Sequence, residues 1–337
     1  SGRMVITLKR NAIKDLIQWK KSAERKPLVL KGARQVGKTW LMKEFGKSYY
    51  DSYVYFNFDE EEELKSIFEI NKNPHRIIEL LSMISGEKIL PEKTLVIFDE
   101  IQECPEALNT LKYFKEKANE YHVIAAGSLL GTLLAKPKSY PVGMVNLLDI
   151  HPLTFDEFLE ATETPLRTYY DSIQKGQQIE EIFHNRFLEA YNYYLIIGGM
   201  PECVSSWVKY KDPAKVAQIQ KELIEVYEND FSKHNGKVNS GRILMVFRSI
   251  VSQLAKSNEK SVTAHGPETL KMRLSGWDLP VCSTAYTMYQ KWSIRFRLLT
   301  KWNSSNFLYL TLGFSNTWPG WTTVQSFSKI TISSKAL

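Results

Sequence analysis

Short apolar runs alternate with helix-like segments along the first half of the chain. Three runs read as buried strands, in Pro27–Leu30, Thr94–Glu100 and Tyr121–Ser128. Ser52–Phe58 alternates aromatic and polar residues, as a strand does. Apolar residues recur at helical spacing in Leu8–Trp19, Thr39–Phe45 and Pro74–Ile84. This alternation predicts an α/β fold, with a parallel sheet flanked by helices and a ligand at the carboxyl ends of the strands.

The pattern changes after residue 150, where helices predominate. A last strand is expected at Val145–Ile150, followed by a helix at Thr154–Ala161 with Thr154 as its N-cap. Longer helical stretches follow at Ile179–Ile197, Ala214–His234 and Gly241–Ala255. On the first predicted helix, Arg10 has two interpretations. It reaches a base or phosphate, or it is a solvated helix charge, and we favour the second.

Gly32 to Thr39 spell GARQVGKT, which fits the phosphate-binding P-loop pattern G-x-x-x-x-G-K-[ST]. Two glycines let the backbone approach a polyphosphate, and the N-terminus of the next helix adds its positive end. Lys38 is expected to pair with the β/γ-phosphates, and the Thr39 hydroxyl is expected to hold Mg²⁺. The predicted nucleotide-binding residues are Gly32, Ala33, Arg34, Gln35, Val36, Gly37, Lys38, Thr39 and Trp40.

Two carboxylates end the apolar run TLVIFDE, the pattern of a Walker B strand. Asp99 is the expected Mg²⁺ partner and Glu100 the expected general base that polarises the attacking water. The next strand ends at Gly127-Ser128. Ser128 is the candidate sensor of the γ-phosphate, with an ordinary Gly-Ser turn as the alternative. The predicted catalytic residues are therefore Glu100, Lys38 and Ser128.

Composition narrows the class of protein without identifying a partner. The chain has 337 residues with 43% hydrophobic content, enough for two or three domains with a real core. Three cysteines give no disulfide framework, and no apolar run reaches the length of a membrane span, so a cytoplasmic protein is expected. Residues 261–337 hold eight Lys or Arg and only two acidic residues, so six of the seven net positive charges lie there. The rest is nearly neutral and favours no particular partner.

The ordered motifs GARQVGKT, LVIFDEIQ, VIAAGSLLG, SYPVG, HPLTFDEFLEA, GGMPE and NDFSKH resemble a bacterial and archaeal group of AAA-like P-loop ATPases. Members of that group carry a nuclease-like C-terminal domain. The resemblance covers Leu8 to Lys260 and implies an AAA-like core in residues 1–165. It also implies a helical lid and the start of a winged-helix-like domain in residues 166–260. One residue departs from the family pattern: a basic residue is expected after Pro-Val-Gly, and Met144 stands there.

Residues 261–337 form an anomalous tail that contains five of the eight tryptophans. We interpret it as translated out of frame, and therefore as poorly packed. In one shifted register, Pro267–Gly276 can encode RDFENAIEW and Lys301–Ser315 can encode MEFFKLFVFDVGLF, both similar to segments the family carries next. The alternative is a divergent Trp-rich β domain.

The function that these patterns favour is Mg²⁺-dependent ATP binding and hydrolysis, driving or gating an attached module. ATP rather than GTP is what the resemblance implies. One alternative is a nucleotide-gated switch or scaffold with little turnover, which Met144 favours. Another is a DNA-processing accessory protein, with DNA as a partner by family analogy alone. The oligomeric state stays open, a homo-oligomer included.

Overall fold

The computed structural model describes residues 8–127, 143–174 and 178–234. These residues form two compact units. One unit comprises the described residues from 10 to 152, and the other comprises Leu8, Lys9 and the described residues from 153 to 234. Among the residues described, no helix is long and apolar enough to cross a membrane.

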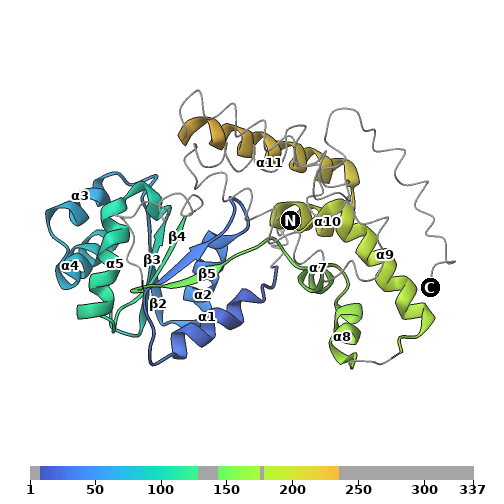
Figure 1. Cartoon of the computed structure of the whole chain (residues 1–337), viewed down its shortest axis with the longest axis horizontal. Coiled ribbons are helices and arrows are strands. Elements are labelled where there is room, and N and C mark those ends of the chain that lie inside the picture. Colours follow the sequence, from blue (N-terminus) through green and yellow to red (C-terminus); the bar gives the residue numbers. More distant parts are fainter. Residues whose placement is uncertain (1–7, 128–142, 175–177, 235–337) are drawn as a thin grey trace, which may run out of the picture. The chain divides into compact units, whose positions relative to one another are not determined.

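The first unit is built on a five-stranded sheet with strand order β2-β3-β4-β1-β5, and all its strands are parallel (Figure 1). The strands are β1 (Leu28–Lys31), β2 (Ser52–Asn57), β3 (Thr94–Asp99), β4 (His122–Gly127) and β5 (Asn146–Asp149). The helices are α1 (Ala12–Lys21), α2 (Lys38–Tyr49), α3 (Glu63–Ile70), α4 (Pro74–Ser85), the 3₁₀ helix η1 (Ile101–Glu103) and α5 (Pro105–Lys117). This is the parallel P-loop NTPase sheet that the sequence predicted.

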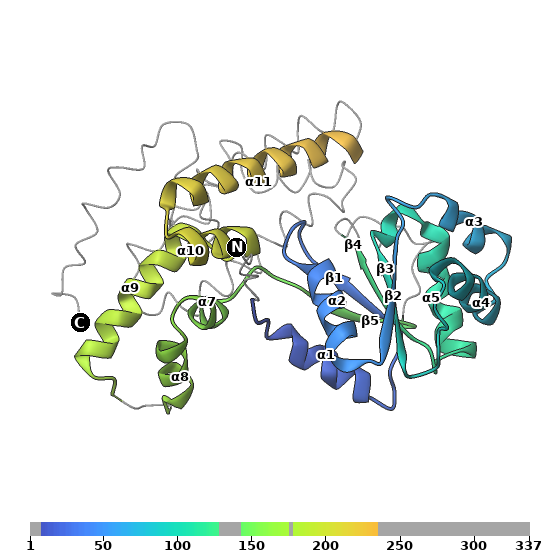
Figure 2. The same cartoon turned by 180° about the vertical axis from the view of Figure 1, so that it is seen from behind.

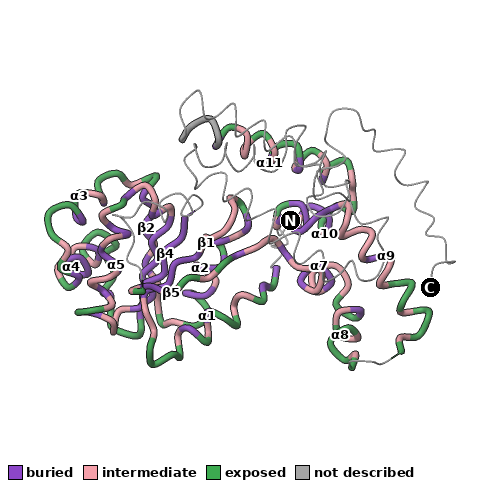
Figure 3. The backbone as a smooth tube through the Cα atoms, in the orientation of Figure 1, coloured by how far each residue is buried: buried purple, intermediate pink, exposed green. Residues whose placement is uncertain are grey.

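Helices cover both faces of this sheet, α1 and α2 on one side and α3 to α5 on the other (Figures 1 and 2). Successive side chains of a strand point to opposite faces, so a strand covered on both sides is apolar throughout. Every residue of β3 is buried, as the purple tube shows in Figure 3. On the α3–α5 face the Phe98 ring lies 5.6 Å from the Phe58 ring and 5.7 Å from the Phe68 ring, between centroids.

Register aligns the polar ends of the strands at one edge of the sheet. Asn57 pairs with Asp99, and Lys31 pairs with both Gly127 and Asp149. The Lys31 ammonium also lies 3.3 Å from an Asp149 carboxylate oxygen. The residues that carry chemistry in the sequence therefore meet at the carboxyl edge of the sheet.

The second unit is helical over its described residues. It contains α7 (Phe155–Thr162), α8 (Thr164–Ser172), α9 (Glu181–Ile197), α10 (Pro201–Tyr210) and α11 (Pro213–His234). Thr154 is the N-cap of α7, and its backbone N–H donates to the Glu157 carboxylate at 2.9 Å.

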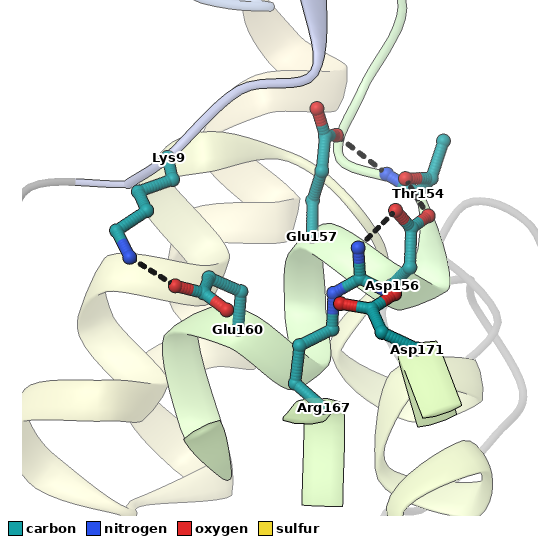
Figure 4. Close-up of polar contacts among 7 residues, drawn as sticks. All are labelled: Lys9, Thr154, Asp156, Glu157, Glu160, Arg167 and Asp171. Atoms are coloured by element: carbon teal, nitrogen blue, oxygen red, sulfur yellow. Dashed lines mark hydrogen bonds and ion pairs between the residues drawn. The ribbon is translucent and has the colours of Figure 1, made fainter. Parts of the chain in front are cut away.

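Salt bridges lie between α7 and α8, within α8, and between α7 and Lys9 (Figure 4). Arg167 of α8 lies 3.4 Å from an Asp156 carboxylate oxygen and 2.6 Å from Asp171. Lys9 forms an ion pair with Glu160 of α7. The acidic residues of the motif HPLTFDEFLEA thus contribute to local packing of the second unit.

The Gly-Gly pair at the end of α9 packs against the segment that enters α7. A Cβ on Gly199 would lie 2.2 Å from the Leu153 carbonyl oxygen, so only glycine allows this approach. The Leu153 N–H donates to the Gly199 carbonyl at 2.6 Å, and the Tyr194 hydroxyl donates to the Leu153 carbonyl at 2.7 Å. The motifs HPLTF and GGMPE, which are far apart in sequence, therefore pack against each other.

Two predicted segments fall outside the described residues. They are the helix expected at Gly241–Ala255 and the anomalous tail at 261–337. The domain boundary predicted at residue 165 falls within α8, which lies wholly in the second unit.

Replacing Phe98 by alanine should destabilise the first unit by about 3–5 kcal/mol, because a fully buried ring leaves a cavity in an aromatic cluster. Native-state hydrogen exchange of the β3 amides measures this change. Met83→Ala is the matched control, since Met83 is 76% exposed and its loss should cost less than about 0.5 kcal/mol. Equal effects of the two substitutions would contradict the assigned core.

Candidate functional site

The predicted phosphate loop lies between β1 and the N-terminus of α2, and its two glycines serve different purposes. A Cβ on Gly32 would lie 2.2 Å from the Ile150 carbonyl oxygen, so the loop passes against the end of β5 without room for a side chain. Gly37 caps α2 with φ of 90°, a left-handed conformation that glycine adopts at little cost. These constraints bring the loop backbone to the helix N-terminus, where an anion binds favourably.

Lys38 is buried, and its ammonium faces the loop itself. The Nζ donates to the Gly32 carbonyl at 2.9 Å and to the Ala33 carbonyl at 2.7 Å. Burial lowers the pKa of Lys38 to about 8, although the nearby Glu100 and Asp99 carboxylates oppose that shift. A phosphate is a stronger acceptor than a carbonyl and would favour the charged form further.

Asp99 ends β3 and is the centre of a hydrogen-bond network. The Thr39 hydroxyl donates to Asp99 Oδ2 at 2.5 Å, and the Tyr55 hydroxyl donates to the same oxygen at 3.0 Å. The Glu100 N–H donates to Oδ1 at 3.0 Å. The structure thus brings together the two predicted metal ligands, Thr39 and Asp99. Their oxygens suit Mg²⁺, which takes one or two protein ligands and keeps waters and phosphate oxygens as the rest.

Glu100 lies directly beyond β3 in an uncommon backbone conformation. Its φ is 49° and its ψ is 43°, a left-handed conformation that costs a non-glycine residue on the order of 1–3 kcal/mol and is found most often at functional sites. Gln102 Nε2 donates to Glu100 Oε2 at 2.5 Å. Gln102 Oε1 is buried and has no hydrogen-bond partner within the described part of the chain.

Tyr55 and Gln102 are site residues that the sequence analysis missed. Burial, followed by the neighbouring Asp99 carboxylate, raises the pKa of Tyr55, so its hydroxyl stays a donor. The Lys43 ammonium lies 3.5 Å from the Tyr55 ring centroid and helps to hold the ring. For Tyr55 the available signal was its place on β2. This strand pairs with β3 and places Asn57, two residues after Tyr55, opposite Asp99.

Arg10 is not a solvated helix charge, and that prediction was wrong. The residue is only 7% exposed, and its Nη1 donates to the Val36 carbonyl of the loop at 2.8 Å. Its Nη2 donates to the His151 carbonyl at 2.5 Å. Arg10 precedes α1, which begins at Ala12, and its guanidinium instead links two backbone segments beside the nucleotide loop.

The other predicted residues differ in how far they are buried. Val36 is fully buried, whereas Trp40 on α2 is 37% exposed. Met144 is half-buried in the turn before β5. Ser128, the candidate phosphate sensor, lies outside the described residues, so its role stays a prediction.

Comparison with protein families agrees with this geometry. Residues 24–159 match the family model described as an AAA domain, a span that contains β1 to β5, the loop and Asp99. The fold, the loop and this match support an AAA-like P-loop ATPase. Residues 188–271 match a model described as a domain of unknown function. The nuclease-like C-terminal domain therefore stays a prediction.

Among curated proteins no match to this chain is found. Solved structures with partial likeness include a Walker-type ATPase of Pyrococcus abyssi, with 16% identity, a TM-score of 0.47, and 75% of this chain and 82% of that chain covered. A STAND signal-transduction ATPase with a tetratricopeptide repeat sensor from Pyrococcus horikoshii shows 16% identity, a TM-score of 0.35, and coverage of 68% and 35%. AMPPCP-bound DnaA from Aquifex aeolicus shows 12% identity, a TM-score of 0.32, and coverage of 86% and 89%. With TM-scores below 0.5, none of these likenesses bears on the function of this chain.

The buried Lys38 should make stability depend on pH. Between pH 8 and pH 10 the folded protein has lost the Lys38 proton while the unfolded chain, with a pKa of 10.5, retains it. The unfolded state then binds more protons, so this contribution to stability rises with pH. Relative to Lys38→Met, the free energy of unfolding should rise by about 2–3 kcal/mol over this window.

Urea denaturation followed by the NMR methyl signals of Leu41 and Met42, both buried in α2, measures this difference. Lys47→Met, on the same helix, is the control, and its stability relative to wild type should not change over the window. Parallel pH profiles of Lys38→Met and wild type would contradict the effect of burial on Lys38.

Proposed function

We propose that residues 10–152 bind ATP with Mg²⁺ and hydrolyse it. The observation that carries the proposal is the contact between the Thr39 hydroxyl and Asp99, beside the buried Lys38 ammonium. These three side chains supply a cation for phosphate and two oxygens for a metal within one loop and one strand end. ATP rather than GTP follows from the family resemblance.

In this proposal the loop backbone and the N-terminus of α2 hold the phosphates, and Lys38 exchanges its two carbonyl acceptors for phosphate oxygens. Thr39 and Asp99 would hold Mg²⁺, which when bound neutralises charge on the transferred phosphoryl group. Glu100 polarises the attacking water as general base. Glu100 directly follows Asp99, so the proposed base is one residue from the proposed metal ligand. Ser128 is proposed as the residue that contacts the γ-phosphate.

The second candidate is a nucleotide-gated switch that turns over slowly. The bond between Gln102 and Glu100 supports it, because Gln102 Nε2 already occupies one oxygen of the carboxylate that would accept a proton from water. Met144, where a basic residue was expected, supports it as well. Both candidates predict nucleotide binding and differ in the rate of phosphate release.

The module that ATP binding drives or gates is proposed to be the C-terminal part of the chain, beginning with the helices α7 to α11. DNA as a partner and assembly into a homo-oligomer are proposals from family resemblance. A cytoplasmic location is proposed from the three cysteines, which give no disulfide framework. For residues 261–337 we propose an out-of-frame origin, which the gene sequence across codons 255–337, read in all three frames, tests directly.

Glu100→Gln should lower the rate of phosphate release by about 10²–10⁴-fold, because the amide cannot accept a proton from water. ATP affinity should stay within about twofold, because Glu100 is not assigned to phosphate or metal. Single-turnover hydrolysis and equilibrium binding of a fluorescent ATP analogue measure the two quantities.

Glu103→Gln is the matched control, since Glu103 lies on the adjacent 3₁₀ helix and should not alter either quantity. If wild type binds ATP and the Glu100→Gln variant releases phosphate at the wild-type rate, the catalytic role assigned to Glu100 is wrong. Tight binding with negligible wild-type release would establish the switch instead.

Tyr55→Phe should raise the Mg²⁺ concentration needed for half-maximal ATP binding by about tenfold, because a hydrogen bond to a charged group contributes about 1.5–3 kcal/mol. The substitution removes only the hydroxyl that orients Asp99. A Mg²⁺ titration at fixed ATP measures the shift. Tyr53→Phe, two residues earlier on β2, is the control and should leave the titration unchanged. A shift of equal size in both variants would refute the assigned role of Tyr55.

A further inference from the structure

A second concave site lies at the amino-terminal edge of the sheet, opposite the edge that carries the P-loop. It is a cavity of about 400 Å³, within the size range of small-molecule sites. Its lining residues come from the segments that precede the strands. Arg25 precedes β1, Tyr49 ends α2, Glu92 precedes β3 and His122 opens β4. The cavity belongs wholly to the first unit and shares no residue with the nucleotide site.

The lining carries an excess of positive charge. Lys20, Lys21 and Arg25 contribute three cations, and Glu92 is the one acidic residue among the residues that line it. Lys20 donates to the Tyr49 carbonyl, and Arg25 donates to the Asn119 carbonyl at 2.5 Å. Over the described ranges none of the three cations forms a salt bridge. The Lys20 ammonium lies 3.8 Å from the Tyr50 ring centroid, and no carboxylate of a described residue neutralises these charges at salt-bridge distance.

Partial burial makes Lys20 and Arg25 stronger partners for an anion than surface lysines are. Burial lowers the pKa of Lys20, more than the neighbouring Asp51 raises it. Burial also lowers the pKa of Arg25, against the opposing effect of Glu92. A group whose charged form has lost hydration gains more when an anion enters than a fully hydrated group does.

His122, which opens β4, lies in the wall of the cavity. The ring is only 3% exposed, and its Nδ1 lies 2.6 Å from the Tyr50 hydroxyl. Its Nε2 is buried and has no hydrogen-bond partner among the residues that the structure describes. A buried polar atom without a partner costs about 1–3 kcal/mol, so such atoms are uncommon and need an explanation.

The protonation state of His122 determines whether Nε2 donates or accepts a hydrogen bond. Burial, followed by repulsion from Arg25 and Lys20, lowers the pKa of His122 to about 3, so the ring is neutral. Burial also raises the pKa of Tyr50, which keeps its hydroxyl protonated. When that hydroxyl donates to Nδ1, the ring proton lies on Nε2, a donor that is enclosed by the protein.

We propose that this cavity binds a small soluble phosphate-bearing molecule, whose oxygens accept hydrogen bonds from Lys20 and Arg25 beside the His122 ring. A tetrahedral dianion suits these two cations, because it offers several acceptor oxygens and two negative charges. The cavity volume suits a small molecule. The site is independent of ATP binding and hydrolysis at the opposite edge of the sheet.

The test uses inorganic phosphate as the probe and the full chain with ¹⁵N-labelled histidine. Phosphate also suits a P-loop, so the titration is carried out in both wild type and Lys38→Ala, which weakens phosphate binding there. The His122 imidazole nitrogen signals should shift saturably in both proteins, with Nε2 protonated. Lys20→Gln and Arg25→Gln should each weaken this binding at least tenfold.

Lys14→Gln is the matched control, because Lys14 is an exposed lysine on the same helix as Lys20 and does not line the cavity. It should leave the phosphate affinity unchanged. Loss of the His122 shift in Lys38→Ala would overturn the proposal by assigning binding to the P-loop. A non-saturating response, an equal weakening by Lys14→Gln, or no His122 shift in wild type would also overturn it. Amide spectra that match wild type show that each variant is folded.

Discussion

The hydrogen bond from the Thr39 hydroxyl to the Asp99 carboxylate is the interaction on which the site depends. It joins the first turn of α2 to the end of β3, two elements separated by 60 residues of chain. A buried carboxylate must be hydrogen-bonded, and Asp99 receives donors from Thr39, Tyr55 and the next backbone N–H. Parallel register makes this possible, because it brings all the strand ends to one edge.

Close backbone approaches determine the shape of the nucleotide loop. Gly32 passes against the Ile150 carbonyl with no space for a side chain, and the buried Arg10 guanidinium links the Val36 and His151 carbonyls. The same principle appears in the helical unit, where Gly199 lies against Leu153. In both units a glycine allows two segments that are far apart in sequence to approach closely, and hydrogen bonds to backbone carbonyls join them.

Sequence periodicity predicted the strands of the sheet well, because β1, β3 and β4 are buried on both faces and are therefore continuous apolar runs. The P-loop and Asp99-Glu100 were found because their chemistry lies in consecutive residues. Tyr55, Gln102 and Arg10 were missed or misjudged for one shared reason. Each acts through a contact that depends on strand pairing or on the path of the chain, and no local pattern reports it.

The sequence by itself determined the class of fold and the residues able to hold phosphate and metal, since local spacing and side-chain chemistry suffice for both. Only the tertiary structure decided which side chains share Asp99, that Glu100 accepts from Gln102, and that Arg10 is buried. It also decided that three cations and His122 meet at the opposite edge of the sheet. Those residues come from segments before different strands, and only parallel pairing, which aligns the starts of strands as it aligns their ends, brings them together.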